Sequence, residues 1–135
     1  MQTFVPYPDF ALSAKVLDRA RLGKQRVEAW QIIQSLTVQE YGWKNHPATK
    51  MWRGHVAALA SYGVAVCDEW IARGYKDSLR PRFEALASPQ APLPAWWGRP
   101  DVHASHRSRL LEKDAGWYGQ FGWSDIPGGY VWPVT

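Results

Sequence analysis

Two stretches of the chain carry hydrophobic residues at intervals of three or four, which is the spacing of one face of an α-helix. The first covers residues 21–36, where Gly23 weakens the opening turn and favours a helix start nearer Lys24. The second covers residues 51–74 and ends at Gly74. Its stripe is the longest in the sequence and predicts a long central helix.

Capping residues and prolines delimit the shorter elements. Ser13 and Asp18 are residue types that cap a helix N-terminus, and each precedes a helical pattern. The loop 41–47 ends in Pro47, which suits the first position of a helix. Two further helices and the proline-rich loop between them are expected at residues 78–87, 103–114 and 88–100.

The fold class follows from these patterns and from chain length. No segment alternates convincingly between hydrophobic and polar residues, so no strand is predicted. A chain of 135 residues, 46% hydrophobic and 21% charged, has the size and balance of one folded domain. We therefore predict a compact all-α single-domain fold over residues 1–135, with an irregular, aromatic-rich C-terminal tail at 117–135.

The single cysteine, Cys67, allows no intrachain disulfide and no cysteine-rich zinc site. The N-terminus has no cationic start followed by an apolar core, and the apolar stretches are too short to span a membrane. We expect a cytoplasmic protein that does not bind membranes and is a monomer.

The charge balance points to a polyanionic partner. Sixteen Lys and Arg against twelve Asp and Glu give a net charge of +4. The nine tryptophans exceed what a three-helix core needs, so some are expected to line a groove. A basic surface with interleaved aromatic residues is the pattern of a nucleic-acid groove, which makes DNA the expected partner. Whether Trp96 and Trp97 contact DNA or the core stays open.

Several cationic or titratable residues fall on the inward faces of the predicted helices. Arg26 shares the stripe of the first long helix, where an unpaired guanidinium would be costly. His55 lies on or beside the inward face of the second, and His46 stands at its entry. Three more residues flank the inward face marked by Leu110: His103, His106 and Arg107. These groups are expected to converge on one polar pocket; the alternative is core histidines and an arginine at the core edge.

Metal chemistry is a weaker interpretation of the same residues. His103 and His106 have the i, i+3 spacing that lets two side chains share a metal, with His46 or His55 as a third ligand. No HExxH motif or carboxylate companion accompanies them. Phosphate-binding and nucleophile-elbow motifs are also absent from the sequence. We expect neither a metal nor another cofactor.

Three motifs, in order along the chain, resemble the pyrimidine dimer DNA glycosylase family. They are LGKQRVEA at 22–29, GHVAAL at 54–59 and SRLLEKDAGWYGQFG at 108–122. The resemblance implies an all-α DNA-repair glycosylase that also cleaves the abasic strand as an AP lyase. In this family the N-terminal α-amine attacks the sugar through a Schiff base, a glutamate stabilises the intermediate and arginines hold phosphates. An α-amine, with a pKa near 8 in peptides, is a feasible nucleophile.

The resemblance also implies roles for individual residues. Met1 would supply the amine and Arg26 falls on the family's arginine. The alignment then puts Val27 at the glutamate position, whereas Glu28 lies about 100° further around the helix. The implied catalytic set is Met1, Arg26, Glu28 and His55. The implied DNA-binding set is Lys24, His46, Arg53, His103, His106, Arg107, Arg109 and Lys113.

Two alternatives remain beside a glycosylase. One is a non-catalytic nucleic-acid-binding relative, which a valine in place of the glutamate favours. The other is an enzyme that uses the four histidines as a pocket for a modified base or a nucleotide.

Overall fold

The computed structural model describes residues 1–133. Its helices are α1 (Phe10–Val16), α2 (Arg19–Thr37), α3 (Pro47–Met51), α4 (Val56–Ala72), α5 (Arg80–Glu84), α6 (Pro100–Lys113) and α7 (Ala115–Tyr118), followed by a 3₁₀ turn at Gly119–Phe121. No strand occurs in this range, so the all-α prediction is confirmed.

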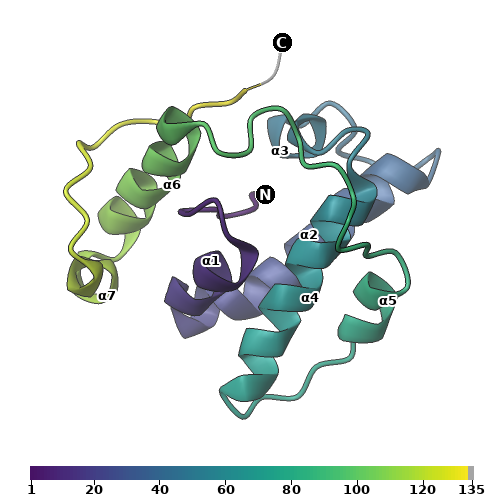
Figure 1. Cartoon of the computed structure of the whole chain (residues 1–135), viewed down its shortest axis with the longest axis horizontal. Helices are drawn as coiled ribbons and strands as arrows, with labels where there is room; N and C mark the ends of the chain where they lie inside the picture. Colours follow the sequence, from purple (N-terminus) through teal and green to yellow (C-terminus); the bar gives the residue numbers. More distant parts are fainter. Residues whose placement is uncertain (134–135) are drawn as a thin grey trace.

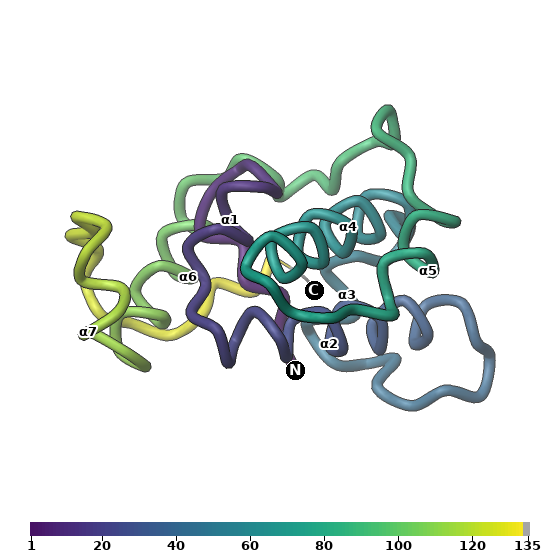
Figure 2. The backbone as a smooth tube through the Cα atoms, turned by 90° about the horizontal axis from the view of Figure 1, so that it is seen from below, coloured from purple at the N-terminus to yellow at the C-terminus, as the bar shows by residue number. Residues whose placement is uncertain are grey.

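The two longest helices, α2 and α4, pack against each other and form the centre of the fold (Figure 1). α1 and α5 both pack on α4, and α3 packs on α2. Figure 2 shows α6 on the same side of α4 as α1, with α5 on the opposite side. The prediction of a long central helix is therefore confirmed.

α2 begins earlier than the sequence pattern suggests. Asp18 caps it as predicted, with its carboxylate accepting a hydrogen bond from the Arg21 amide. Helix then continues through Gly23, because this residue lets α2 approach α4 closely: a Cβ there would lie 2.8 Å from the Trp70 ring. Ser13 does not cap α1. Asp9 does so, by accepting a hydrogen bond from the Leu12 amide.

The stripe at 51–74 is not one continuous helix. α3 ends at Met51, and α4 begins at Val56 after a turn in which Gly54 has φ +82°. A left-handed conformation suits glycine and ends helical hydrogen bonding. The break turns Trp52 into the core, where its side chain is fully buried and Nε1 donates to the Thr3 hydroxyl.

The remaining helices differ from their predicted bounds by a few residues. The helix expected at 78–87 is shortened to α5. The one expected at 103–114 starts three residues earlier, because Pro100 occupies its first position. After α7, which contributes the buried Tyr118, the C-terminal tail runs along the outside of α6 (Figure 1).

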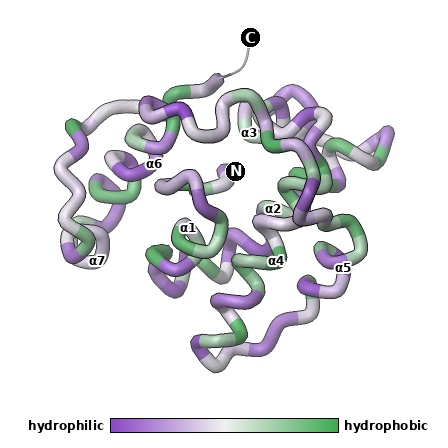
Figure 3. The backbone as a smooth tube through the Cα atoms, in the orientation of Figure 1, coloured by the Kyte–Doolittle hydropathy of each residue, from purple (hydrophilic) through white to green (hydrophobic). Residues whose placement is uncertain are grey.

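Hydrophobic residues are unevenly shared between the helices. Figure 3 shows mostly hydrophobic residues along α4 and mostly hydrophilic ones along α6. Aromatic rings fill the core between them. Trp96 packs edge-on against Trp52 and donates to the Met51 carbonyl, and Trp97 packs against Phe10. Trp96 thus belongs to the core, and the partly buried Trp97 packs against it.

Gly63 is a sensitive point of this core. A Cβ at this position would lie 2.3 Å from the ring of the fully buried Phe83. Gly63→Ala should therefore lower the free energy of unfolding by about 1–3 kcal/mol, although alanine favours helix. Denaturant unfolding measures the change, with Gly42→Ala as control, since a Cβ at Gly42 meets nothing within 4 Å. Equal stability of both variants would contradict the expected clash.

Candidate functional site

The first six residues form an extended segment that lies between α6 and the α2–α4 pair (Figure 1). Residues 2–6 are buried, yet they belong to no sheet. Buried peptide groups need partners. Here most of those partners are polar side chains of the surrounding helices, which explains why such residues occupy the inward faces of α2, α4 and α6.

α2 binds the segment with two side chains. Gln25, which is 1% exposed, donates from Nε2 to the Gln2 carbonyl and accepts from the Phe4 amide at 2.9 and 2.7 Å. One turn further along α2, the Glu28 carboxylate accepts from the Gln2 amide at 3.1 Å. Together they fix the first residues of the chain against α2.

α4 contributes one further contact at the core. The Tyr62 hydroxyl donates to the Phe4 carbonyl. Complete burial raises the pKa of Tyr62 far above its usual value, so this hydroxyl keeps its proton.

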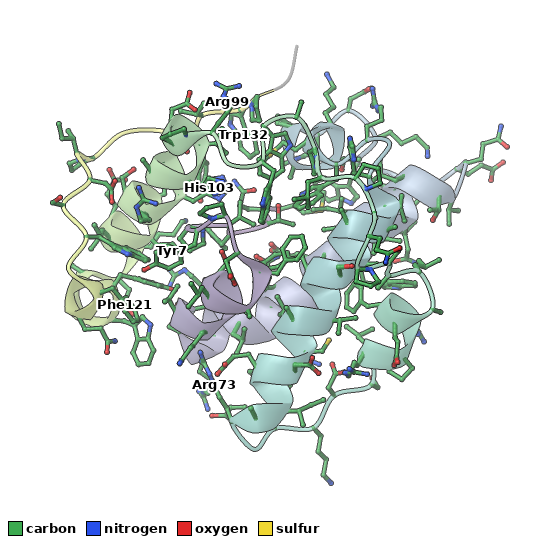
Figure 4. The ribbon with its side chains drawn as sticks, viewed as in Figure 1. Tyr7, Arg73, Arg99, His103, Phe121 and Trp132 are labelled. Carbon is green, nitrogen blue, oxygen red and sulfur yellow. The ribbon has the colours of Figure 1, made fainter. Side chains whose placement is uncertain are left out.

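α6 binds the next residues through two histidines. The Val5 amide donates to Nδ1 of His106 at 2.9 Å, and Nδ1 of His103 lies 2.7 Å from the Val5 carbonyl oxygen. The Gly98 amide donates to the other ring nitrogen of His103. Figure 4 shows His103 reaching from α6 toward the N-terminal segment. Both histidines are buried, at 2% and 0% exposure, and so do not reach the surface.

Arg107 extends this set of contacts to the end of the segment. Its Nη1 donates to the Pro6 carbonyl at 2.7 Å. The same guanidinium pairs with both oxygens of Asp125 in the C-terminal tail. Arg107 therefore ties the N-terminal segment to the tail.

The free end of the segment lies at a cavity of about 420 Å³. Four of the residues proposed from sequence meet here, from three parts of the chain: Met1, Lys24, Glu28 and Lys113. The remaining lining comes from Gln2, Phe4, Ala20, Arg21, Gln25 and Tyr130. The cavity thus combines the N-terminus, one carboxylate and several cationic side chains.

Glu28 is the carboxylate of this cavity. Its side chain is 14% exposed, and Lys24 Nζ lies 3.7 Å from Oε1. Val27, at the position where the alignment places the family's glutamate, points outward and is 44% exposed. The 100° step between the two positions therefore turns Glu28, rather than residue 27, toward the N-terminus.

His46 does not line the cavity but lies within reach of the charges of the N-terminus and Glu28. Its Nδ1 caps α3 by accepting from the Ala48 amide, and its ring packs edge-on between Trp43 and Trp132. Burial lowers the pKa of His46; the N-terminal ammonium group lowers it further, while Glu28 opposes the shift. The residue is close enough to both groups to sense their charges.

Other proposed residues lie elsewhere. Arg26 is paired with the buried Asp77 and stacks over the Trp70 ring at 4.7 Å, in a neighbouring depression. His55 has its Nδ1 3.1 Å from the Pro92 carbonyl. Arg53 donates to a loop carbonyl, and Arg109 pairs with Glu112 while covering the Tyr130 ring. The four histidines consequently do not share one pocket.

Sequence reasoning missed Gln25 and Tyr130. Gln25 follows Leu22 by three positions and precedes Ala29 by four, so helical spacing already placed it on the buried face. Tyr130 lies in the irregular tail, where no periodicity indicates which way a side chain points.

Within residues 1–133, no group of three or more His, Cys, Asp or Glu is placed to hold a metal. No helix of that range has both the length and the apolar character to cross a membrane.

A comparison with protein families gives one finding. The family model described as pyrimidine dimer DNA glycosylase matches residues 1–80, more than half of the chain. The match covers the N-terminal segment, α2 and α4, and hence the Met1 and Glu28 side of the cavity. No curated protein and no solved structure matches the chain.

Proposed function

Because the chain belongs to the pyrimidine dimer DNA glycosylase family, we propose that it cleaves the glycosidic bond of damaged pyrimidines in DNA and then cleaves the abasic strand. The observation that carries this proposal is the meeting of Met1 and Glu28 at one cavity. An amine can form an imine with a sugar carbon, and a carboxylate beside it can stabilise the positive charge that develops.

The proposed reaction assigns one task to each group. The unprotonated α-amine of Met1 attacks C1′ of the damaged nucleotide, and the base leaves with the electrons of the glycosidic bond and takes up a proton. Opening of the sugar ring gives a protonated imine, whose positive charge the Glu28 carboxylate stabilises. Loss of a C2′ proton then expels the 3′ phosphate and cuts the strand.

Cationic side chains around the cavity suit the DNA backbone. Lys24 and Lys113 are exposed at its edge, and Arg21 lines it while paired with Asp18. Neutralising phosphates with such residues gives binding that weakens as salt rises. A cavity of about 420 Å³ lies in the range of small-ligand pockets and suits one unstacked nucleotide. Arg26 has no part in this proposal because Asp77 already occupies its guanidinium.

Borohydride trapping tests the function. The protein is incubated with duplex DNA carrying one cyclobutane dimer, and separately with abasic-site DNA, before reduction. We expect strand cleavage and a covalent protein–DNA product with both substrates. A chain extended by residues ahead of Met1 should form no such product, because its amine lies outside the cavity. Lys24→Ala and Lys113→Ala should still form it, which excludes the two lysines of the cavity as the nucleophile.

A non-catalytic DNA-binding protein is the second candidate. The observation that favours it is that the Gln2 amide, an uncharged group, already occupies one Glu28 oxygen. Salt-sensitive DNA binding without cleavage or trapping on either substrate would support this candidate and reject the glycosylase.

A further inference from the structure

We propose that His103 and His106 are positioning residues, which hold the α-amine in the cavity by binding both polar groups of the Val5 residue as neutral imidazoles. The proposal rests on the proposed function and adds to it how the nucleophile is held in place. Both histidines bind Val5, which is four residues along the segment from Met1, and neither lines the cavity, so they act on the amine only through the segment.

The hydrogen bonds require a different tautomer of each histidine. Nε2 of His103 accepts from the Gly98 amide and therefore carries no proton, so Nδ1 carries it and donates to the Val5 carbonyl. Nδ1 of His106 accepts from the Val5 amide, so its proton is on Nε2. The two histidines are one helical turn apart on α6 and bind the same residue, Val5. His103 donates a hydrogen bond to it and His106 accepts one from it.

This arrangement fixes the register of the segment. A slip of one residue in one direction would present Pro6 to His106, and proline has no amide proton to donate. A slip in the other direction would present Phe4 and turn every side chain of the extended segment to the opposite face. The position of Met1 in the cavity follows from the register at Val5.

Protonation would break one contact of each histidine, the Gly98 contact of His103 and the Val5 contact of His106, while protonated His103 still donates from Nδ1 to the Val5 carbonyl. A second proton on His103 would face the Gly98 amide proton, and one on His106 would face that of Val5. Burial lowers the pKa of both residues, that of His106 to about 3, with the charge of His103 adding to the effect there. Both pKa values are depressed below the ordinary value of 6.5. The contribution to docking is therefore complete above pH 6.5 and is lost as pH falls below it.

Few charged groups face this pair. On α6 itself, Arg107 lowers the pKa of His103 and Asp101 raises it. Arg107 is in turn neutralised by Asp125 of the tail. The other neighbours are uncharged rings and peptide groups: from the segment, Phe4 and Val5; from the loop before α6, Trp96, Trp97 and Gly98; and from the tail, Tyr130. The segment at 2–6 carries no charged side chain.

Hydrogen exchange of the Val5 amide, measured without DNA, tests the docking directly. His106→Phe removes the acceptor and should lower the protection factor of this amide about tenfold or more. His106→Asn keeps an acceptor near the position of Nδ1 and should restore most of the protection. Ser108→Ala is the matched control, because Ser108 is a buried polar residue of α6 that bonds only to the Ser105 carbonyl. Unchanged protection in His106→Phe would overturn the proposal.

The pH dependence separates positioning from simple packing. Between pH 7 and pH 5, the wild-type protection factor should fall by about tenfold or more, since an undocked histidine with an ordinary pKa gains a proton. The double variant His103→Asn and His106→Asn keeps a donor and an acceptor for Val5 without titration, although it loses the Gly98 contact, so its protection should stay constant with pH. A fall of equal size in both proteins would refute the role of the histidines. His46 is present in both and does not enter the difference.

Trapping kinetics connect docking with the nucleophile. At saturating abasic-site DNA, His106→Phe should trap about 10- to 100-fold more slowly, as expected for a displaced reacting group, while DNA affinity changes little. His106→Asn should recover most of the rate, and Ser108→Ala should keep it. Wild-type trapping rates in a protein whose Val5 amide has lost protection would overturn the proposal. If the wild type forms no adduct but passes the exchange tests, the proposed function alone fails.

Discussion

Glu28→Gln is expected to slow base release at saturating DNA by about 100-fold or more, because a positioned carboxylate contributes that much when it stabilises charge and transfers protons. The amide is nearly the same size and can still accept from the Gln2 amide, so the N-terminal segment keeps its anchor. What is lost is the negative charge beside the cationic imine. Single-turnover cleavage of dimer-containing duplex measures the effect.

Two companion variants sharpen this test. Glu84→Gln is the control, since Glu84 is an exposed partner of Arg80 on α5 and lies outside the cavity. Adding Val27→Glu to Glu28→Gln places a carboxylate where the family alignment expects it, but on the exposed side of α2. We expect no recovery of the rate. Recovery would mean that residue 27, rather than residue 28, faces the reacting sugar.

Asp77→Ala is expected to cause the largest loss of stability, about 3 kcal/mol, which corresponds to roughly 10 °C in Tm for a chain of this size. The Asp77 side chain is fully buried and binds the Arg26 guanidinium together with the amides of Leu79 and Arg80. Its removal leaves a charge with 16% exposure and two amides without their partner. Asp77→Asn should lose less, since its amide oxygen still accepts from the backbone.

Thermal and denaturant unfolding measure these changes. Asp68→Ala is the matched control, because Asp68 pairs with Arg80 at the surface, where solvent screens the pair and its contribution to stability is small. Burial would raise the pKa of Asp77, but hydrogen bonds from the Arg80 amide and Arg26 outweigh it and lower the pKa below 3.8. The difference between wild type and Asp77→Asn should therefore shrink as pH falls below 3.8. A difference independent of pH would show that the charge does not matter.

The sequence predicts the parts of the fold that depend on neighbouring residues. The cap at Asp18 and the helix start at Pro47 follow from local backbone chemistry, and both occur. The break at 52–55 does not follow from local rules, because the burial of Trp52 beside Thr3 competes with a hydrophobic stripe that continues across it. The need for glycine at position 23 likewise depends on Trp70, far along the chain.

The sequence likewise predicts some features of the candidate site and not others. Helical spacing placed Arg26 and the histidines of α6 on inward faces and correctly raised the need for partners. It could not name those partners, because they are Asp77 and the peptide groups of the first six residues, which carry no side-chain pattern. The convergence of Met1 with Lys113 also depends on how α6 docks.

The extended N-terminal segment is bound by helix side chains and not by a neighbouring strand, which has a consequence for synthesis of the protein. Val5 and the histidine that binds its amide are 101 residues apart in the chain. Residues 2–4 find their partners on α2 and α4, but the peptide groups of Val5 must wait without theirs until α6 has been made and has folded. The register at Val5, on which the position of the proposed nucleophile depends, is thus completed only after α6 has folded. A protein truncated before α6 would keep Met1 and Glu28 and still lack an assembled site.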